Sequence, residues 1–295
     1  MKVAITGATG LVGRRVVELL SGRIEFIPLG RDNGFDLGKP DVTSWTTGLA
    51  KADALLHLAA RTDVDRIENE RSQKERGPAW TVNVESVRAL SNAAFTRRMP
   101  MCLVSTDFVF PANTEGPYPE APATTRGSAE TSWYGWTKLM AEEATRRSPE
   151  NSILRISYPY VARHPTRIDH ARRMVQLHKE GKLYPLFADQ RITPSFVDDV
   201  AEALGIILEK RLAGTFHAAS IDRTTPYDFG VRLLQALGRD TSDVRSATFP
   251  THLSSGKALR PKDGGLETAS SRRAGLPMRS TEDAIAEFAK QSRET

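Results

Sequence analysis

The sequence predicts an α/β fold in which helices cover both faces of a parallel sheet. Three observations support this prediction. Short apolar runs that favour strands alternate with amphipathic runs that favour helices as far as residue 157. A glycine-rich turn follows the first apolar run, and small or hydroxylated residues follow the third and the fourth. Strands and helices that alternate in this way form a doubly wound, Rossmann-type sheet, and the less regular remainder of the chain predicts a smaller C-terminal lobe.

The first unit is a strand over 2–6, a glycine-rich turn and a helix. The turn reads Gly7-x-x-Gly10-x-x-Gly13, and apolar residues at helical spacing follow it. Gly7 permits a tight turn, Gly10 lets a pyrophosphate approach the backbone, and Gly13 lets the helix lie close to the strand. The N-terminus of the helix adds free N–H groups that suit an anion. Strand, turn and helix in this order predict a dinucleotide site.

A second strand is predicted over 24–29 and a third over 53–58. The small residues Ala59 and Ala60 follow the third strand and let a cofactor come close to the backbone. Arg31 follows the second strand, at the place where a carboxylate would bind the ribose of NAD. A guanidinium there favours a 2′-phosphate, so we expect NADPH, with NADH as the alternative; Arg31 as a solvated loop residue is the competing interpretation. The predicted cofactor-binding residues are Gly7, Thr9, Gly10, Leu11, Val12, Arg31, Asp36, Leu37, Ala59, Ala60 and Lys138.

Hydroxyl groups and a tyrosine–lysine pair follow in the second half of the predicted sheet. A strand over 101–104 leads into Thr106 and Asp107, at the carboxyl end where open sheets bind ligands. Tyr134 and Lys138 are four residues apart, so on a helix they share one face. A nearby lysine cation favours the phenolate, and we expect it to lower the pKa of Tyr134 towards neutrality. Such a pair suits carbonyl reduction; a surface helix with a chance pair is the alternative.

The remaining elements divide the chain into two units. A helix is predicted over 79–98 and a long loop above the site over 108–131. Further strands are predicted over 152–157, 183–187 and 215–218, and further helices over 170–179, 199–212, 227–237 and 281–290. We assign residues 1–156 and 196–225 to the sheet domain and residues 157–195 and 226–295 to a substrate-binding lobe.

Composition excludes several classes of protein. The net charge of +5 is spread along the chain without a dense basic tract, so nucleic acid is not the expected partner, whereas an anionic small molecule fits. The single cysteine, Cys102, excludes an internal disulfide, and the histidines lack the spacing of a metal site, so we expect no metal. We expect no membrane segment and no signal peptide, and therefore a cytoplasmic protein.

Taken together, the glycine turn, Thr106 and Tyr134-x-x-x-Lys138 resemble the extended short-chain dehydrogenases/reductases. Three further blocks narrow the resemblance: Ser-Thr-Asp-Phe-Val-Phe at 105–110, Asp-Gln-x-x-x-Pro-Ser at 189–195 and Arg-Pro-Lys at 260–262. With these blocks the chain resembles the dTDP-4-dehydrorhamnose reductase family over nearly its whole length.

The resemblance implies a reductase that holds NAD(P)H across the carboxyl ends of the strands and a nucleotide-diphospho-sugar in the smaller lobe. Tyr134 would donate a proton to the sugar carbonyl, Lys138 would assist it and bind the nicotinamide ribose, and Thr106 would bind the carbonyl oxygen. The expected substrate-binding residues are Asp107, Arg191 and Arg260; the two arginines would hold the diphosphate, or else pair with surface acids.

Departures from the family pattern leave the sugar open. Phe108 and Tyr158 stand where the family usually has tyrosine and tryptophan, and Arg15 replaces the glutamate of members with a metal-bridged dimer. We therefore expect no such metal, while a homodimer stays open. A 4,6-dehydratase would need a second acid directly after Asp107. Phe108 occupies that position here, which counts against dehydration. An NAD-retaining sugar-nucleotide epimerase and a non-catalytic NADP-binding regulatory subunit are two further functions that this fold could serve.

Overall fold

Six parallel strands form the central sheet, in the order β2-β1-β3-β4-β5-β7, in a computed structural model that describes residues 1–250 and 257–293. The strand order reverses beside β1, and the carboxyl ends at such a reversal are where open sheets bind ligands. The predicted doubly wound sheet is confirmed. Its strands are β1 (Lys2–Thr6), β2 (Glu25–Leu29), β3 (Ala54–His57), β4 (Met101–Thr106), β5 (Ser152–Ile156) and β7 (Gly214–Ala218).

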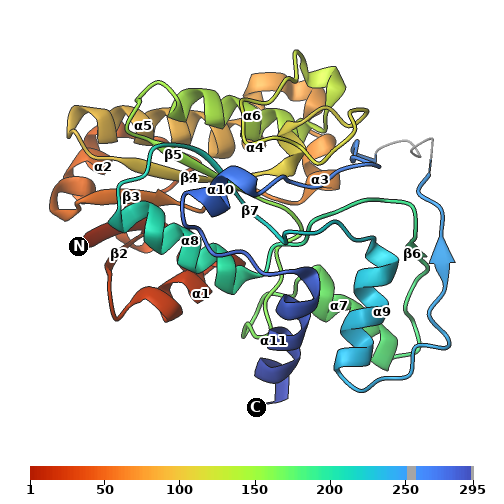
Figure 1. Ribbon diagram of the computed structural model, residues 1–295. Coiled ribbons are helices and arrows are strands. Elements are labelled where there is room, and N and C mark those ends of the chain that lie inside the picture. Colours follow the sequence, from red (N-terminus) through yellow and green to blue (C-terminus); the bar gives the residue numbers. More distant parts are fainter. Residues whose placement is uncertain (251–256, 294–295) are drawn as a thin grey trace.

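Helices cover both faces of the sheet because successive strand residues point to opposite sides (Figure 1). Val3 and Ile5 pack on one side with α1 and α8, whereas Ala4 packs on the other side with α2, α5 and α6. All three strand residues are fully buried, so both faces of the sheet contribute to the core. The bounds are α1 (Leu11–Leu20), α2 (Val42–Gly48), α5 (Ser86–Thr96), α6 (Trp133–Thr145) and α8 (Val197–Glu209).

A second, smaller core lies beyond the carboxyl end of β5. Figure 1 shows α7, α9 and α11 grouped below and to the side of the sheet. Tyr160 lies at the centre of this core, 5.1 Å from the Phe229 ring centroid. A separate core supports the predicted smaller lobe, whose boundaries stay a prediction. Its elements are α7 (His170–Lys179), α9 (Pro226–Ala236), α11 (Thr281–Arg293) and the parallel pair β6 (Leu186–Phe187) and β8 (Ser246–Ala247).

Several predicted elements differ in their bounds. The expected helix over 79–98 is α4 (Pro78–Trp80), a π-helical turn over Thr81–Glu85 and then α5. The wider turn contains Asn83, whose amide oxygen accepts from the Arg61 N–H at 2.9 Å and whose nitrogen donates to Thr137 at 3.1 Å. The helix predicted over 199–212 is α8, which begins two residues earlier. Short elements without clear periodicity were not predicted, namely α2, β8 and α10 (Ala269–Arg273). A further short helix, α3 (Val64–Glu68), follows β3 along the chain.

Two further observations concern the outer helices. Arg15 of α1 forms a salt bridge of 2.7 Å with Asp198 of α8 and so joins two helices. Among the described residues, no helix combines the length and apolar composition that crossing a bilayer requires.

A buried ion pair ties α6 to the sheet. Arg155 of β5 donates from Nε and Nη2 to the two carboxylate oxygens of Glu142, at 2.9 and 2.7 Å. Both side chains are 0% exposed. Burial alone would raise the pKa of Glu142, but the hydrogen bonds and charge of Arg155 outweigh it and hold this pKa below its ordinary value. The pair therefore stays ionised inside the protein.

Removing one partner of this pair should destabilise the fold strongly. Glu142→Gln leaves the Arg155 charge buried without its counterion, and we expect unfolding to become easier by about 3–5 kcal/mol. Glu143→Gln is the matched control, because Glu143 is 56% exposed and pairs only at the surface with Arg146; it should cost at most about 1 kcal/mol. Chemical denaturation of the three proteins checks this, and equal losses in the two variants would contradict it.

Candidate active site

A cavity of about 750 Å³ opens at the carboxyl ends of the central strands. The glycine turn after β1, the residues after β3 and β4, the first turns of α6 and a segment of the smaller lobe line it. It therefore lies where the sheet and the smaller lobe meet. The cavity brings together most of the predicted site residues: Gly7, Thr9, Gly10, Leu11, Val12, Ala59, Ala60, Thr106, Asp107, Tyr134, Lys138 and Arg260.

The glycine turn is packed too closely for side chains. Gly7 has a left-handed φ of +74°, and a Cβ atom on it would lie 2.8 Å from the Ala59 nitrogen. A Cβ on Gly13 would lie 2.1 Å from the Gly7 carbonyl oxygen. Gly10 caps α1 without any side-chain hydrogen bond, so the N–H groups of the first helical turn remain open to a ligand. This backbone cradle fits the diphosphate of a dinucleotide.

Tyr134 and Lys138 lie on α6 beside the end of β4. The Tyr134 ring is buried and meets the edge of Phe108 at 5.8 Å between centroids. The ammonium group of Lys138 donates to the Val104 carbonyl at 2.8 Å. Burial lowers the pKa of Lys138 to about 8, although the Glu142 carboxylate acts in the opposite direction.

The expected lowering of the tyrosine pKa is wrong for this structure. Burial first, and then the negative charge of Asp107, raise the pKa of Tyr134 above its ordinary value, and only a hydrogen bond with Thr106 acts in the other direction. The physical reason is that burial disfavours the phenolate and a buried carboxylate lies close to it, while the Lys138 ammonium donates to a backbone carbonyl. A phenol with a raised pKa stays protonated at neutral pH.

Gly135 allows α6 to approach β4 closely. A Cβ atom at this position would lie 2.0 Å from the Phe108 carbonyl oxygen. The helix begins at Ser132, whose hydroxyl accepts from the Gly135 N–H at 3.0 Å. Thr131 donates from its own hydroxyl to the same Phe108 carbonyl at 2.6 Å. These contacts fix Tyr134 beside the residues that end β4.

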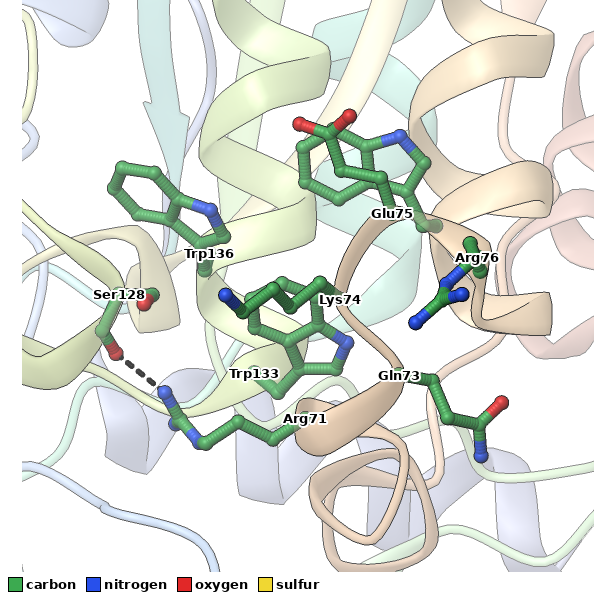
Figure 2. Close-up of a pocket in the computed structure, with 9 residues that line it drawn as sticks. Arg71, Gln73, Lys74, Glu75, Arg76, Ser128, Trp133 and Trp136 are labelled. Carbon is green, nitrogen blue, oxygen red and sulfur yellow. Dashed lines mark hydrogen bonds between the residues drawn. The ribbon is translucent and has the colours of Figure 1, made fainter.

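A second hollow, about 480 Å³ in volume, lies at the N-terminal end of α6 (Figure 2). Trp133 and Trp136 line it together with the segment that follows α3. Figure 2 shows the Arg71 side chain extending to the Ser128 carbonyl, where it donates a 2.7 Å hydrogen bond. Arg71 also donates to the Thr131 carbonyl at 2.8 Å. These bonds hold the segment that leads into α6, and so they help to position Tyr134.

Four of the predicted residues do not line the main cavity that the described residues form. They are Arg31, Asp36, Leu37 and Arg191. Arg31 is 85% exposed beyond β2 and lies 3.6 Å from the carboxylate of Asp36. Leu37 follows in the same loop. Arg191 is exposed in the smaller lobe, where its backbone pairs with Asp263. The structure does not bring these side chains to Tyr134, and their predicted binding roles stay predictions.

Arg260 lines the cavity but already has a partner. It donates to the Asp65 carboxylate at 3.0 Å, and Lys257 lies 3.3 Å from the same group. The hydrogen bond from Arg260 is the largest cause that lowers the pKa of Asp65, to about 2. A phosphate that binds Arg260 must therefore compete with Asp65.

Tyr158, named above only as a departure from the family pattern, and Ser157 were given no binding role from the sequence. Tyr158 lines the cavity with a left-handed φ of +43°, and its hydroxyl accepts from Gln190 at 3.3 Å. Strained backbone of this kind is common at ligand sites. Ser157 donates to Asp107 at 2.7 Å. The available signal was their place at the end of a predicted strand, which Ser157 closes and Tyr158 follows. Within residues 1–250 and 257–293, no three histidine, cysteine or acidic side chains form a group that could hold a metal.

The chain is similar in sequence to known reductases. The family described as "RmlD substrate binding domain" matches residues 1–294. A dTDP-4-dehydrorhamnose reductase of Burkholderia thailandensis is 32% identical over 241 residues, covering 78% of this chain and 76% of that protein. A probable low-salt glycan biosynthesis reductase, Agl14, of Haloferax volcanii is 31% identical over 262 residues, covering 84% of each chain.

A solved structure has the same fold over almost the full length. The dTDP-4-dehydrorhamnose reductase of Bacillus anthracis, in complex with NADP, superposes with a TM-score of 0.84 and is 22% identical, covering 98% of each chain. At this identity the likeness concerns the fold.

Adding a methyl group to the glycine cradle should destabilise the protein. In Gly13→Ala the new Cβ meets the Gly7 carbonyl, so α1 must move away from β1, and we expect a loss of about 1–3 kcal/mol. Gly22→Ala is the matched control because nothing lies within 4 Å of its Cβ; its change should stay within about 0.5 kcal/mol. Denaturant unfolding gives both values. A Gly13→Ala protein as stable as the Gly22→Ala protein would show that the contact is not tight.

Proposed function

Because the chain belongs to the RmlD substrate binding domain family, we propose that it uses NADPH to reduce the carbonyl group of a nucleotide-linked keto sugar. The resemblance to the dTDP-4-dehydrorhamnose reductases is confirmed by this match and by the relatives named reductases. One observation carries the proposal: a glycine cradle for a dinucleotide and the Thr106, Tyr134 and Lys138 side chains line the same cavity.

Two features of the chain suit NADPH. The open N–H groups at the start of α1 supply hydrogen-bond donors for the diphosphate, and Gly7 and Gly13 leave the backbone bare there. Arg31 follows β2 at the carboxyl edge of the sheet, next to β1, and its exposed guanidinium supplies a charge for a 2′-phosphate. When bound, the dihydronicotinamide supplies the hydride for the reduction.

The chain's own residues supply the proton. The Tyr134 phenol is protonated at neutral pH, so it can donate to the carbonyl oxygen as negative charge develops there. Lys138 remains a cation at neutral pH, because its pKa is about 8, and its charge stabilises the phenolate that forms. The Val104 carbonyl holds the Lys138 ammonium in place.

We propose a dTDP-linked 4-keto-6-deoxy sugar as the substrate, as the names of the relatives suggest. Arg260 is the candidate for the diphosphate, since it lines the cavity and belongs to the smaller lobe. Tyr158 lines the same cavity and is a candidate for contact with the sugar ring. Arg191 is exposed, so it would bind a diphosphate only at the outer rim of the cavity.

The competing functions are less well supported. A regulatory subunit without activity would have no need of Tyr134, Lys138 and Thr106 at one cavity. An epimerase that retains NAD would consume no NADPH in net terms, whereas the relatives in sequence are named reductases. The test is NADPH oxidation measured against a panel of nucleotide-linked 4-keto sugars, and a protein that oxidises none of them is not such a reductase.

Removing the tyrosine hydroxyl should abolish most of the turnover. Tyr134→Phe keeps the ring that packs on Phe108 but removes the proton donor, so kcat for NADPH oxidation should fall by about a hundredfold or more. Tyr184→Phe is the matched control, because that phenol is 52% exposed and lies outside the cavity. Steady-state kinetics at saturating cofactor checks the prediction. A Tyr134→Phe enzyme with normal kcat would refute the assignment of the proton donor.

Arg31 should determine the choice of cofactor. A charge-assisted hydrogen bond to the 2′-phosphate contributes about 1.5–3 kcal/mol, which corresponds to roughly tenfold to a hundredfold tighter binding of NADPH than of NADH. In Arg31→Ala most of this preference should disappear while NADH affinity stays the same. Arg76→Ala removes an exposed arginine outside the cavity and should leave the preference intact. Calorimetric titration measures the four affinities, and equal binding of both cofactors by the unmodified protein would exclude this role.

A further inference from the structure

A turn of the smaller lobe, residues 164–167, lies against the glycine turn after β1. His164 makes this contact, with its Nε2 atom 3.3 Å from the Gly10 carbonyl oxygen. That oxygen also accepts from the Arg14 N–H at 3.1 Å, and a carbonyl oxygen has two lone pairs, so both bonds can form. The contact joins the smaller lobe to the backbone cradle that suits a dinucleotide diphosphate.

The hydrogen bonds of the His164 ring fix the position of its proton. Nδ1 accepts from the backbone N–H groups of Thr166 at 3.2 Å and of Arg167 at 2.9 Å. A ring nitrogen that accepts carries no hydrogen, and in a neutral imidazole the other nitrogen is then the donor. Nε2 therefore donates to Gly10. Burial is the largest cause that lowers the pKa of His164, and nearby arginine charges lower it further, so the ring stays neutral at neutral pH.

Arg172 of α7 holds the carbonyl groups of the same turn. It donates to the His164 carbonyl at 3.1 Å and to the Arg167 carbonyl. Its own charge is balanced by the carboxylate of Asp169, which lies 2.7 Å away and has a side chain only 1% exposed. The backbone of Arg167 is therefore fixed at its N–H by His164 and at its carbonyl by Arg172.

The Arg167 side chain lines the candidate active-site cavity together with Gly10 and the first residues of α1. One imidazole ring separates the Arg167 backbone N–H from the Gly10 carbonyl. The side chain is exposed, and within residues 1–250 and 257–293 its guanidinium has no carboxylate partner, in contrast to that of Arg172. An unpaired cation thus shares the cavity with the open N–H groups at the start of α1.

We propose that Arg167 binds the diphosphate of the nicotinamide cofactor together with the start of α1, and that His164 positions it for this contact. The inference rests on the proposed function, since it needs a dinucleotide in the cavity. The helix terminus offers neutral donors, whereas a guanidinium adds a full charge and a planar pair of donors that matches phosphate oxygens. Because Arg167 belongs to the smaller lobe, the bound cofactor would be held from both lobes.

The test is calorimetric titration of the unmodified protein and of Arg167→Ala with NADPH, NADH and dTDP. NADPH and NADH carry the same diphosphate, and only NADPH carries a 2′-phosphate. Arg167→Ala should therefore weaken both cofactors by the same factor, roughly tenfold, whereas Arg31→Ala should weaken NADPH alone. Arg173→Ala is the matched control, because Arg173 is an exposed arginine of α7 that lies outside the cavity, and it should leave both affinities unchanged.

The positioning role of His164 has a separate readout. His164→Ala should weaken both cofactors, and the double variant with Arg167→Ala should bind them no more weakly than Arg167→Ala does, because the histidine acts through the arginine. Losses that simply add in the double variant would overturn this role. Thermal unfolding compares the stability of the variants, and Arg167→Ala removes only an exposed side chain, so it tests the diphosphate contact independently of His164.

The titrations separate the possible failures. Unchanged NADPH and NADH affinities in Arg167→Ala would overturn the diphosphate contact and leave the proposed function standing. A loss confined to NADPH would assign Arg167 to the 2′-phosphate, and a loss confined to dTDP would assign it to the substrate; either result would overturn the inference. An unmodified protein that binds neither cofactor would overturn the proposed function and this inference together.

Discussion

The ion pair between Glu142 and Arg155 is the contact on which the geometry of the site depends. Burying two charges away from water destabilises a fold unless the charged groups attract each other closely and all of their hydrogen-bonding positions have partners. Arg155 meets this condition with both oxygens of Glu142, the Ala121 carbonyl at 2.7 Å and the face of Phe110, 4.8 Å from its guanidinium carbon. One side chain therefore joins β5, α6 and the long loop above the cavity, and α6 has little freedom to slide.

The same pair shapes the electrostatics of the cavity. Glu142 lies one turn after Lys138 on α6, and its charge opposes the fall in the pKa of Lys138 that burial causes. On the other side of Tyr134 lies Asp107, whose charge raises the pKa of the phenol. The Tyr134 phenol thus shares the cavity with a cation held at a backbone carbonyl and with a buried carboxyl group.

Close backbone contacts complete the site. Gly13 brings α1 against the turn after β1, Gly7 packs against the residues after β3, and Gly135 brings α6 against the residues after β4. In each case a single Cβ atom would come within 3 Å of the backbone. Both faces of the sheet thus use glycine for the same purpose, which is to let a helix begin close to the carboxyl end of a strand. The cavity between these helices follows from that packing.

The sequence by itself determined what depends on local geometry. Alternating strands and helices, the glycine spacing and the four-residue interval from Tyr134 to Lys138 each lie within a few neighbouring residues, so the fold class and most of the cavity wall could be predicted. The tertiary structure alone decided the pairing of Arg260 with Asp65, 195 residues away, and of Asp107 with Ser157, 50 residues away. It also decided the direction of the Tyr134 pKa shift. Burial and charge act through space, and no spacing along the chain shows which distant groups share a buried volume.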